Sequence, residues 1–336
     1  MSAQSSRQKG FVLVLTLWML AIITIAAGYL ADRVMHAMEL AQRSQKNTQV
    51  LLNLSETRAE ILFRLGTTRL SLYGLGQGPD GTIALDNRPY RGVGETIVRL
   101  QDNRGLLNLN IVSDDRLHRL LGILDVPAGQ RGMLIDTLHD YVDVDSLKRL
   151  NGAEAPEYAA AGLPPPRNER LSTPFEPRRI LGWRGLNQLW DNERLPSLST
   201  TSYSVALNPN TAPWEVLATL PGMTNEVARN IILQRKLIPF ASPDQFAQLS
   251  GIPPALLFWQ IIMLPSDAVR VIQSAPGLPW ALQYNVSLTP NEDHGPWRID
   301  YYYKTRLTYK DDKVKDIPEL PKRSTLPAAF SAPFLP

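Results

Sequence analysis

The chain has 336 residues, which is enough for more than one folded lobe, since single domains usually run to roughly 100–200 residues. Its 35 Lys and Arg nearly balance 32 Asp and Glu, so the formal charge of +3 gives no strong positive field of the kind that nucleic-acid-binding proteins usually carry. The chain has no cysteine, which excludes disulfides, thiolate metal ligands and thiol catalysis but leaves the compartment open.

An uncharged apolar segment occupies residues 11–30, behind a short polar leader, residues 1–10, that contains Arg7 and Lys9. At 1.5 Å per residue, a helix over this segment spans about 30 Å, the thickness of the hydrocarbon core of a bilayer. Basic residues ahead of the segment favour a cytoplasmic N-terminus, with the rest of the chain on the far side of the membrane. A cleavable secretory signal is the alternative, but residues 26–30 match its small-residue cleavage site only weakly.

Apolar residues recur at helical spacing beyond the apolar segment, and the first proline of the chain is Pro79. The spacing predicts one continuous helix over residues 11–65, of which residues 31–65 lie outside the membrane. A coiled-coil stalk could have a similar pattern, but the heptad register is poor.

Strands are predicted over residues 66–110. The segment 74–94 is rich in glycine, and residues 96–100 alternate like a half-buried strand, which indicates a turn and a hairpin. Residues 102–110 then read DNRGLLNLN, in which Gly105 permits a tight turn and the asparagines can bond backbone groups locally.

Short helices are predicted from residue 111 to residue 265, and they carry a cluster of carboxylates. Residues 140–145 read DYVDVD and are followed by GAE at residues 152–154 and by Tyr158. The oxygens of Asp143, Asp145 and Glu154 could gather around a hard cation such as calcium. The other interpretation, a solvated helix end or a salt-bridged loop, stays open because the full twelve-residue calcium loop pattern is missing.

Residues 206–252 resemble a tandem helix-hairpin-helix region. Asn208, Asn210 and Thr211 are expected to cap its first helix, and residues 220–223, LPGM, form the hairpin. The second helix should pack through its apolar positions, which are Ala228, Ile231 and Ile232.

The hairpin lacks what a DNA-binding hairpin normally has. Such hairpins carry a second glycine that lets phosphate approach the backbone, and here that position is Thr224. The second helix offers few cations, with Arg229 and Arg235 set against Glu226. We therefore expect a packing module and no nucleic acid partner.

Two strands are predicted near the C-terminus, over residues 280–288 and 297–309, and residues 290–296 are rich in turn formers. The two strands should pair and complete the sheet within residues 266–310. Residues 311–336 are charged and then proline-rich, and we expect a mobile tail.

Catalytic motifs are missing from the sequence. It has no nucleophile elbow, phosphate-binding loop or HExxH helix, and the adjacent His139 and Asp140 would diverge on a helix. We predict that the chain is not an enzyme.

The leader and the start of the apolar segment resemble a class III prepilin signal. The residues Lys9-Gly10-Phe11 match the site at which a dedicated peptidase cuts between Gly10 and Phe11 and methylates the new N-terminal Phe11. Pilins usually carry a glutamate at the fifth mature position, where its carboxylate pairs with the N-terminal amine of a neighbouring subunit, and here this position is Leu15. Because an unpaired charge in an apolar core costs several kcal/mol, such a subunit should terminate a filament rather than continue it.

Taken together, these features resemble the K-type minor pseudopilins of the type II secretion system (general secretion pathway protein K). The resemblance rests on Gly10-Phe11, Leu15, residues 102–110, the D-x-D…G-A-E block and residues 206–252. It implies an α+β fold in which a long N-terminal transmembrane helix packs on an antiparallel pilin-like sheet, with a large inserted helical domain over residues 111–265.

The resemblance also implies a function and a location. The family sits at the tip of the pseudopilus with I- and J-type minor pseudopilins, initiates assembly of the major pseudopilin and holds calcium in the inserted domain. The prepilin peptidase and the inner-membrane assembly platform would be further partners, and the head would be periplasmic. Two alternatives remain: the tip minor pilin of a type IV pilus, and a membrane-anchored DNA-uptake receptor, which would predict a small chain with a basic hairpin.

Overall fold

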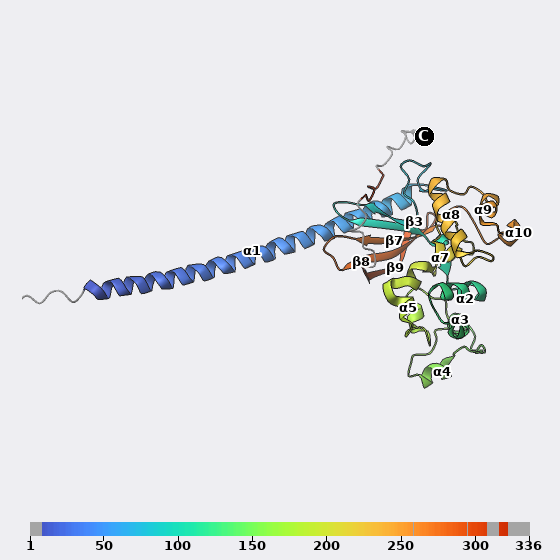
Figure 1. Cartoon of the computed structure of the whole chain (residues 1–336), viewed down its shortest axis with the longest axis horizontal. Coiled ribbons are helices and arrows are strands. Elements are labelled where there is room, and N and C mark those ends of the chain that lie inside the picture. Colours follow the sequence, from blue (N-terminus) through green and yellow to red (C-terminus); the bar gives the residue numbers. More distant parts are fainter. Residues whose placement is uncertain (1–8, 258, 294, 308–315, 322–336) are drawn as a thin grey trace, which may run out of the picture. The chain divides into compact units, whose positions relative to one another are not determined.

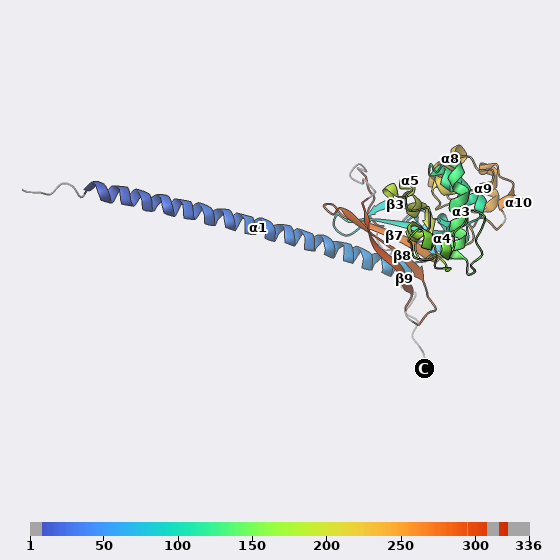
Figure 2. The same cartoon turned by 90° about the horizontal axis from the view of Figure 1, so that it is seen from below.

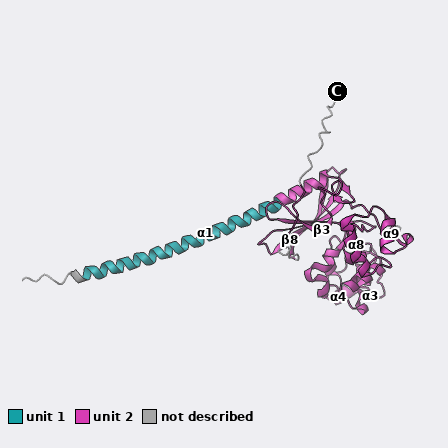
Figure 3. Ribbon diagram, turned by 45° about the horizontal axis from the view of Figure 1, so that its top comes forward, with its two compact units in different colours: residues 1–55 teal, residues 56–336 magenta. Residues whose placement is uncertain are grey.

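The computed structural model describes residues 9–257, 259–293, 295–307 and 316–321. It divides into two compact units, Met1–Ser55 and Glu56–Pro336, which Figure 3 colours separately. Most of the predicted leader lies outside the described residues, and Lys9 and Gly10 begin the first helix.

Helix α1 (Lys9–Thr67) confirms the prediction of one long N-terminal helix and is drawn in blue in Figure 1. Within the first unit, every side chain of the predicted membrane segment, residues 11–30, is exposed. In the second unit the helix becomes one-sided, because Ile61, Leu62 and Leu65 are buried whereas Phe63 is half exposed.

The second unit is built on a five-stranded antiparallel sheet with the strand order β3-β4-β7-β8-β9. Its strands are β3 (Asp86–Arg91), β4 (Ile97–Asp102), β7 (Ala268–Ser274), β8 (Trp280–Leu288) and β9 (Trp297–Arg306). The predicted pairing of the two C-terminal strands is confirmed by a register that runs from Trp280 opposite Arg306 to Leu288 opposite Trp297.

The central strand β7 was not predicted. All seven of its residues are buried, so its sequence AVRVIQS shows no alternation between apolar and polar positions. A strand covered on both faces loses the period-two pattern by which half-buried strands are found.

The two faces of the sheet are covered by different parts of the second unit. The last turns of α1 pack on one face, where Ile61 and Leu65 share a core with Val98, Val271 and Tyr284. The chain between β4 and β7 packs on the other face. There the buried Arg270 donates to the backbone carbonyls of Pro196, at 2.8 Å, and of Ser199. Phe175 meets Tyr303 edge to face at 5.1 Å on the same side.

A small hairpin, β1 (Leu70–Ser71) with β2 (Gly74–Leu75), lies where the predicted glycine-rich segment begins. Gly74 has a φ of +124°, and a Cβ there would lie 2.2 Å from the carbonyl oxygen of Ile83. This position therefore requires glycine.

The chain between the two halves of the sheet is mainly helical and has its own core, which includes Leu120, Leu134, Trp183, Ile231 and Phe246. Figure 2 shows its helices gathered together beside the sheet. The helices are α2 (Asp114–Ile123), α3 (Ala128–Val142), α4 (Ala155–Ala160), α5 (Asn187–Trp190), α6 (Arg194–Leu198), α7 (Trp214–Leu217), α8 (Asn225–Leu237), α9 (Pro243–Ser250) and α10 (Pro254–Leu257). Three 3₁₀ turns, η1 (Asn103–Gly105), η2 (Glu176–Arg179) and η3 (Asp191–Glu193), and the parallel pair β5 (Leu107–Asn108) and β6 (Ser199–Thr200) complete the unit.

One buried carboxylate joins the sheet to the helical region. Asp102 is fully buried; its Oδ1 accepts from the N–H of Arg104 at 3.0 Å and from the N–H and hydroxyl of Ser266 at 2.8 and 2.7 Å. Its Oδ2 accepts from the Asn208 amide at 3.0 Å and from the Thr211 hydroxyl at 2.8 Å. Because Asp102 ends β4 and Ser266 precedes β7, this carboxylate clamps the points where the chain leaves the sheet and returns to it.

The predicted cap of the first hairpin helix was wrong. Helix α7 begins only at Trp214, after Pro213, and no side chain caps it. Asn208 and Thr211 bind Asp102 instead, while the Asn210 amide exchanges two hydrogen bonds with the backbone of Phe240, at 2.8 and 2.9 Å. These polar residues connect distant segments, and Asn208 also closes a local turn by accepting from the N–H of Asn210 at 3.0 Å.

Part of the predicted mobile tail, residues 316–321, pairs with the edge of the sheet. The N–H of Arg91 donates to the carbonyl of Pro318 at 2.8 Å, and the N–H of Leu320 donates to the carbonyl of Arg91 at 3.0 Å. This short parallel bridge covers the edge of β3 at Arg91. The other residues of the predicted tail, 311–315 and 322–336, lie outside the described residues.

Candidate functional site

The N-terminal positions singled out in the sequence lie at the start of α1. Gly10 and Phe11 belong to its first turn, and Leu15 follows about one turn later. Among the described residues, only this helix is long and apolar enough to cross a membrane, with a mean hydropathy of 2.5 over its best window. The helix carries no buried side chain in that window, so the apolar surface is available to lipid or to other helices.

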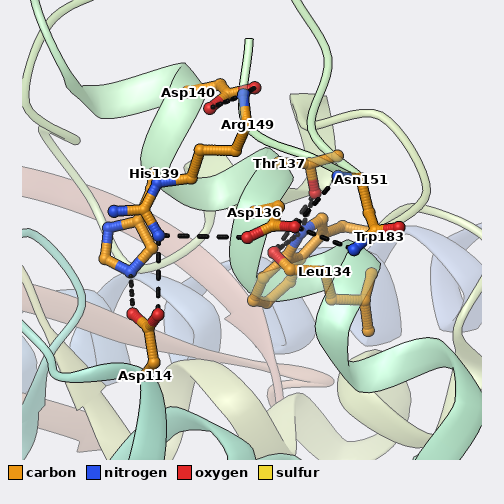
Figure 4. A network of polar contacts seen from close by, with 9 residues as sticks. All are labelled: Asp114, Leu134, Asp136, Thr137, His139, Asp140, Arg149, Asn151 and Trp183. Carbon is orange, nitrogen blue, oxygen red and sulfur yellow. Dashed lines mark hydrogen bonds and ion pairs between the residues drawn. The ribbon is translucent and has the colours of Figure 1, made fainter.

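The carboxylate block follows the end of α3, where the chain folds back over Asp140. This carboxylate is fully buried, and each of its oxygens accepts from the N–H of Arg149 at 3.2 Å. A Cβ at Gly152 would lie 1.8 Å from Asp140 Oδ2, so only glycine lets the returning chain pass. The aspartate and the glycine of the sequence block thus form one structural unit, part of which is drawn in Figure 4.

Further polar contacts hold the same loop against α2 and α3 (Figure 4). The Asp136 carboxylate accepts from both the N–H and the side-chain amide of Asn151, at 3.0 Å each. Asp114 lies 2.8 Å from His139 Nε2 and 3.5 Å from Arg149 Nη1. The segment from residue 143 to residue 153 is therefore tied down at several points.

The three predicted cation ligands lie on this loop and at its end. Asp143 follows α3 and is half-buried, Asp145 is exposed, and Glu154 is 4% exposed at the start of α4. One oxygen of Asp143 (Oδ1) and one of Glu154 (Oε1) are buried and accept no hydrogen bond. Buried oxygens without a donor are costly unless a cation or water satisfies them.

Asn168 joins these carboxylates, although the sequence did not indicate it. Its side-chain amide donates to the backbone carbonyl of Asp145 at 2.6 Å, and its Oδ1 is buried and accepts no hydrogen bond. The backbone of Asn168 has a φ of +50°, a conformation that asparagine tolerates better than most residues. That preference is the single local signal that could have drawn attention to it.

The carboxylates of this cluster disfavour one another's ionisation. Burial raises the pKa of Glu154, and the charges of Asp140, Asp143 and Asp145 raise it further. The pKa of Asp143 is raised in the same way, by burial first and then by Asp145 and Asp140. A bound cation would relieve this mutual repulsion.

The residues present fit a hard cation only as a mixed set of oxygens. In the described part of the chain, no three carboxylate, imidazole or thiolate groups converge into a metal site by themselves. A cation here would therefore need the neutral oxygen of Asn168 beside the carboxylates of Asp143 and Glu154, and calcium accepts such mixtures of carboxylate and amide oxygens.

The helix-hairpin-helix region is packed against α2. The carbonyl of Leu220 in the hairpin accepts from Arg119 at 3.1 Å, and the buried hydroxyl of Thr219 accepts from Arg116 Nε at 3.1 Å. Thr224, the residue in place of a second glycine, caps α8 by accepting from the N–H of Val227 at 3.2 Å.

The two arginines of α8 are also engaged within the fold. Arg235 is buried and donates to the carbonyls of Pro209 and Ala212, and Arg229 lies 4.0 Å above the ring of Trp214. On the packing face, Ala228 and Ile231 are buried and Ile232 is partly buried. This arrangement supports the packing interpretation of the module.

His139 and Asp140 do not form a catalytic pair. His139 contacts Asp114, and the carboxylate of Asp140 accepts backbone N–H groups of the returning loop. Asp140 holds the loop in place, and His139 joins α3 to α2.

Comparison with known proteins identifies two segments of the chain. The family model of type II secretion system protein K matches residues 100–187, and a helix-hairpin-helix motif model matches residues 202–258. No curated protein matches.

A solved structure has a similar fold. It is a chain of the crystal structure of the GspK-GspI-GspJ complex from the type 2 secretion system of enterotoxigenic Escherichia coli. The match covers 82% of this chain and 99% of that chain, with a TM-score of 0.52 and 18% sequence identity. It shows the predicted pilin-like fold with a long N-terminal helix, an antiparallel sheet and a helical insertion, and the motif match confirms the hairpin region.

Proposed function

We propose that this chain is a type II secretion system protein K that sits at the tip of the pseudopilus; the family-model match over residues 100–187 and the similar fold of the solved structure support this. There it would assemble with I- and J-type minor pseudopilins, initiate polymerisation of the major pseudopilin and support export of folded proteins across the outer membrane. The observation that carries the tip position is Leu15, an apolar residue where pilins usually carry a glutamate, within the segment 11–30, whose side chains are all exposed.

The physical argument concerns what each side of the helix can bind. The exposed apolar surface of residues 11–30 is stable only in lipid or among other apolar helices, since each Å² removed from water contributes about 25 cal/mol. Such helices can bundle on one side of the subunit. Without a carboxylate at residue 15, the chain cannot pair with the N-terminal amine of a further subunit, so growth stops there.

Processing and location follow from the same segment. The prepilin peptidase would cut between Gly10 and Phe11 on the cytoplasmic side and methylate Phe11, and the inner-membrane assembly platform would then receive the chain. The second unit would lie in the periplasm. The solved complex contains proteins named GspK, GspI and GspJ, and this supports I- and J-type partners for the present chain.

Calcium would stabilise the loop after α3. The ion would be held by Asp143, Asp145 and Glu154 together with Asn168. Three of these residues, Asp143, Glu154 and Asn168, each have a buried side-chain oxygen that accepts no hydrogen bond. When bound, the ion supplies the positive charge that this cluster lacks, while Asp140 and Asp136 orient the loop through its backbone.

Two other functions are less well supported. A type IV pilus tip subunit would share Leu15 and the long helix, but the family model matched by residues 100–187 belongs to type II secretion. A DNA-uptake receptor needs a hairpin open to phosphate, whereas here Leu220 and Thr219 are engaged with α2 and Arg235 is buried.

A clean deletion tests the proposal. Loss of the chain should abolish secretion of folded exoproteins while they still accumulate in the periplasm, and the full chain supplied in trans should restore export. Retained secretion in the deletion strain would refute the proposed role.

A further inference from the structure

A groove with a cavity volume of about 450 Å³ lies between the start of α2 and the helix-hairpin-helix region. Its lining includes residues before α2, the segment ahead of α7, the hairpin and the chain after α10. Three apolar side chains in this lining are exposed to solvent: Ile111 at 39%, Val205 at 64% and Trp259 at 81%. The walls can therefore bury apolar parts of a ligand.

Arg116 lines the groove and makes few hydrogen bonds within the protein. Its Nε donates to the Thr219 hydroxyl at 3.1 Å, and its Nη2 is buried without a hydrogen bond. No carboxylate among the described residues forms an ion pair with it, although Asp115 lines the same groove. Enclosure without a counter-charge lowers the pKa of Arg116 to about 10, and burial is its one cause.

Two buried arginines of the same unit, Arg235 and Arg270, also have a buried Nε without a hydrogen bond, but they make more hydrogen bonds in total than the half-buried Arg116. Arg235 and Arg270 each donate to at least two backbone carbonyls. Arg116 has one hydroxyl partner for five donor hydrogens, so an enclosed cation is left largely uncompensated. A second cation, Arg119, lines the groove beside it and donates to the Leu220 carbonyl.

We propose that this groove binds a carboxylate on an extended segment of another protein, with the forked guanidinium of Arg116 holding the carboxylate and the apolar walls holding its neighbours. Arginine suits this task because its planar donors match both oxygens of a carboxylate. A nucleic acid is disfavoured because the groove has two cations, one nearby carboxylate and apolar walls, not a row of cations. The inference does not depend on the proposed role at the pseudopilus tip.

The test uses the full chain in detergent and a matched pair of peptides, acetyl-Leu-Glu-Leu-amide and acetyl-Leu-Gln-Leu-amide, titrated by calorimetry. The glutamate peptide should bind at least about tenfold more tightly than the glutamine peptide. Arg116→Gln should remove that preference, whereas Arg184→Gln, at an exposed arginine outside the groove lining, should preserve it.

A second variant tests the proposal even if Arg116→Gln fails to fold. Val205 is exposed, so Val205→Asp should leave the fold intact, and its charge should weaken binding of the glutamate peptide by about tenfold. Equal binding of the two peptides, absence of binding, or an unchanged preference in Arg116→Gln would overturn the proposal. So would displacement of the peptide by a double-stranded oligonucleotide, which would assign the groove to nucleic acid.

Discussion

Removing calcium from the loop after α3 should destabilise the second unit. Three buried oxygens, on Asp143, Glu154 and Asn168, accept no hydrogen bond, and leaving such a group unsatisfied costs about 1–3 kcal/mol. An ion present at about 100 times its dissociation constant stabilises the folded state by about 2.7 kcal/mol. For a unit of this size we expect a rise in Tm on the order of 5 °C.

The effect should depend on pH in a defined direction. The folded-state pKa values of Asp143 and Glu154 are raised, so without calcium the folded state disfavours their ionised forms. Their contribution to stability is then fully present below the ordinary carboxyl pKa and is lost as the pH rises through the raised values. Calcium binds the ionised forms, so its stabilising effect should grow over the same interval towards neutral pH.

The assay is thermal unfolding of the full chain at about pH 5 and pH 7, with calcium or with a chelator. The double variant Asp143→Asn with Glu154→Gln should lose the calcium-dependent rise in Tm, while Asp80→Asn, an exposed aspartate on another loop, should keep it. The same rise in the double variant, or no rise in the unaltered chain, would refute the reasoning.

Three further substitutions test the fold and the filament argument. Asp102→Ala leaves the buried Asn208 amide and the Ser266 N–H without their acceptor and removes the shorter hydrogen bond of the Thr211 hydroxyl. At about 1–3 kcal/mol for each unsatisfied group we expect a loss of about 3–5 kcal/mol in chemical denaturation, and a loss below about 1 kcal/mol would contradict the clamp. Gly152→Ala places a methyl group against Asp140, so the loop should become sensitive to proteolysis; unchanged cleavage would show that the loop can yield. Leu15→Glu should allow more than one copy per pseudopilus in quantitative mass spectrometry, unlike Leu15→Ile, and an unchanged copy number would count against termination at this residue.

Patterns that repeat along the chain were readable from sequence. The long apolar helix needs only local periodicity, and β9 alternates because one of its faces is more exposed than the other. The sequence of β8 alternates as well, although its residues 281–286 are all buried. β7 has no such alternation, because both of its faces are covered, so its central place in the sheet could not be found in this way.

Polar residues with distant partners were less predictable. Asn208 and Thr211 have the residue types of a helix cap, yet both bind Asp102, more than a hundred positions earlier in the chain. The candidate cation site shows the same limit. Its carboxylates stand out in the sequence, whereas Asn168 is placed beside them by a hydrogen bond that its amide donates to the backbone carbonyl of Asp145. Local rules do not contain such long-range contacts.

Affinity purification of the tagged full chain from its own bacterium tests the central claim most directly. The account predicts recovery of one I-type and one J-type minor pseudopilin for each copy of the chain, and the mature chain should begin at an N-methylated Phe11. Recovery of the intact, processed chain without either minor pseudopilin would contradict a place in the tip complex.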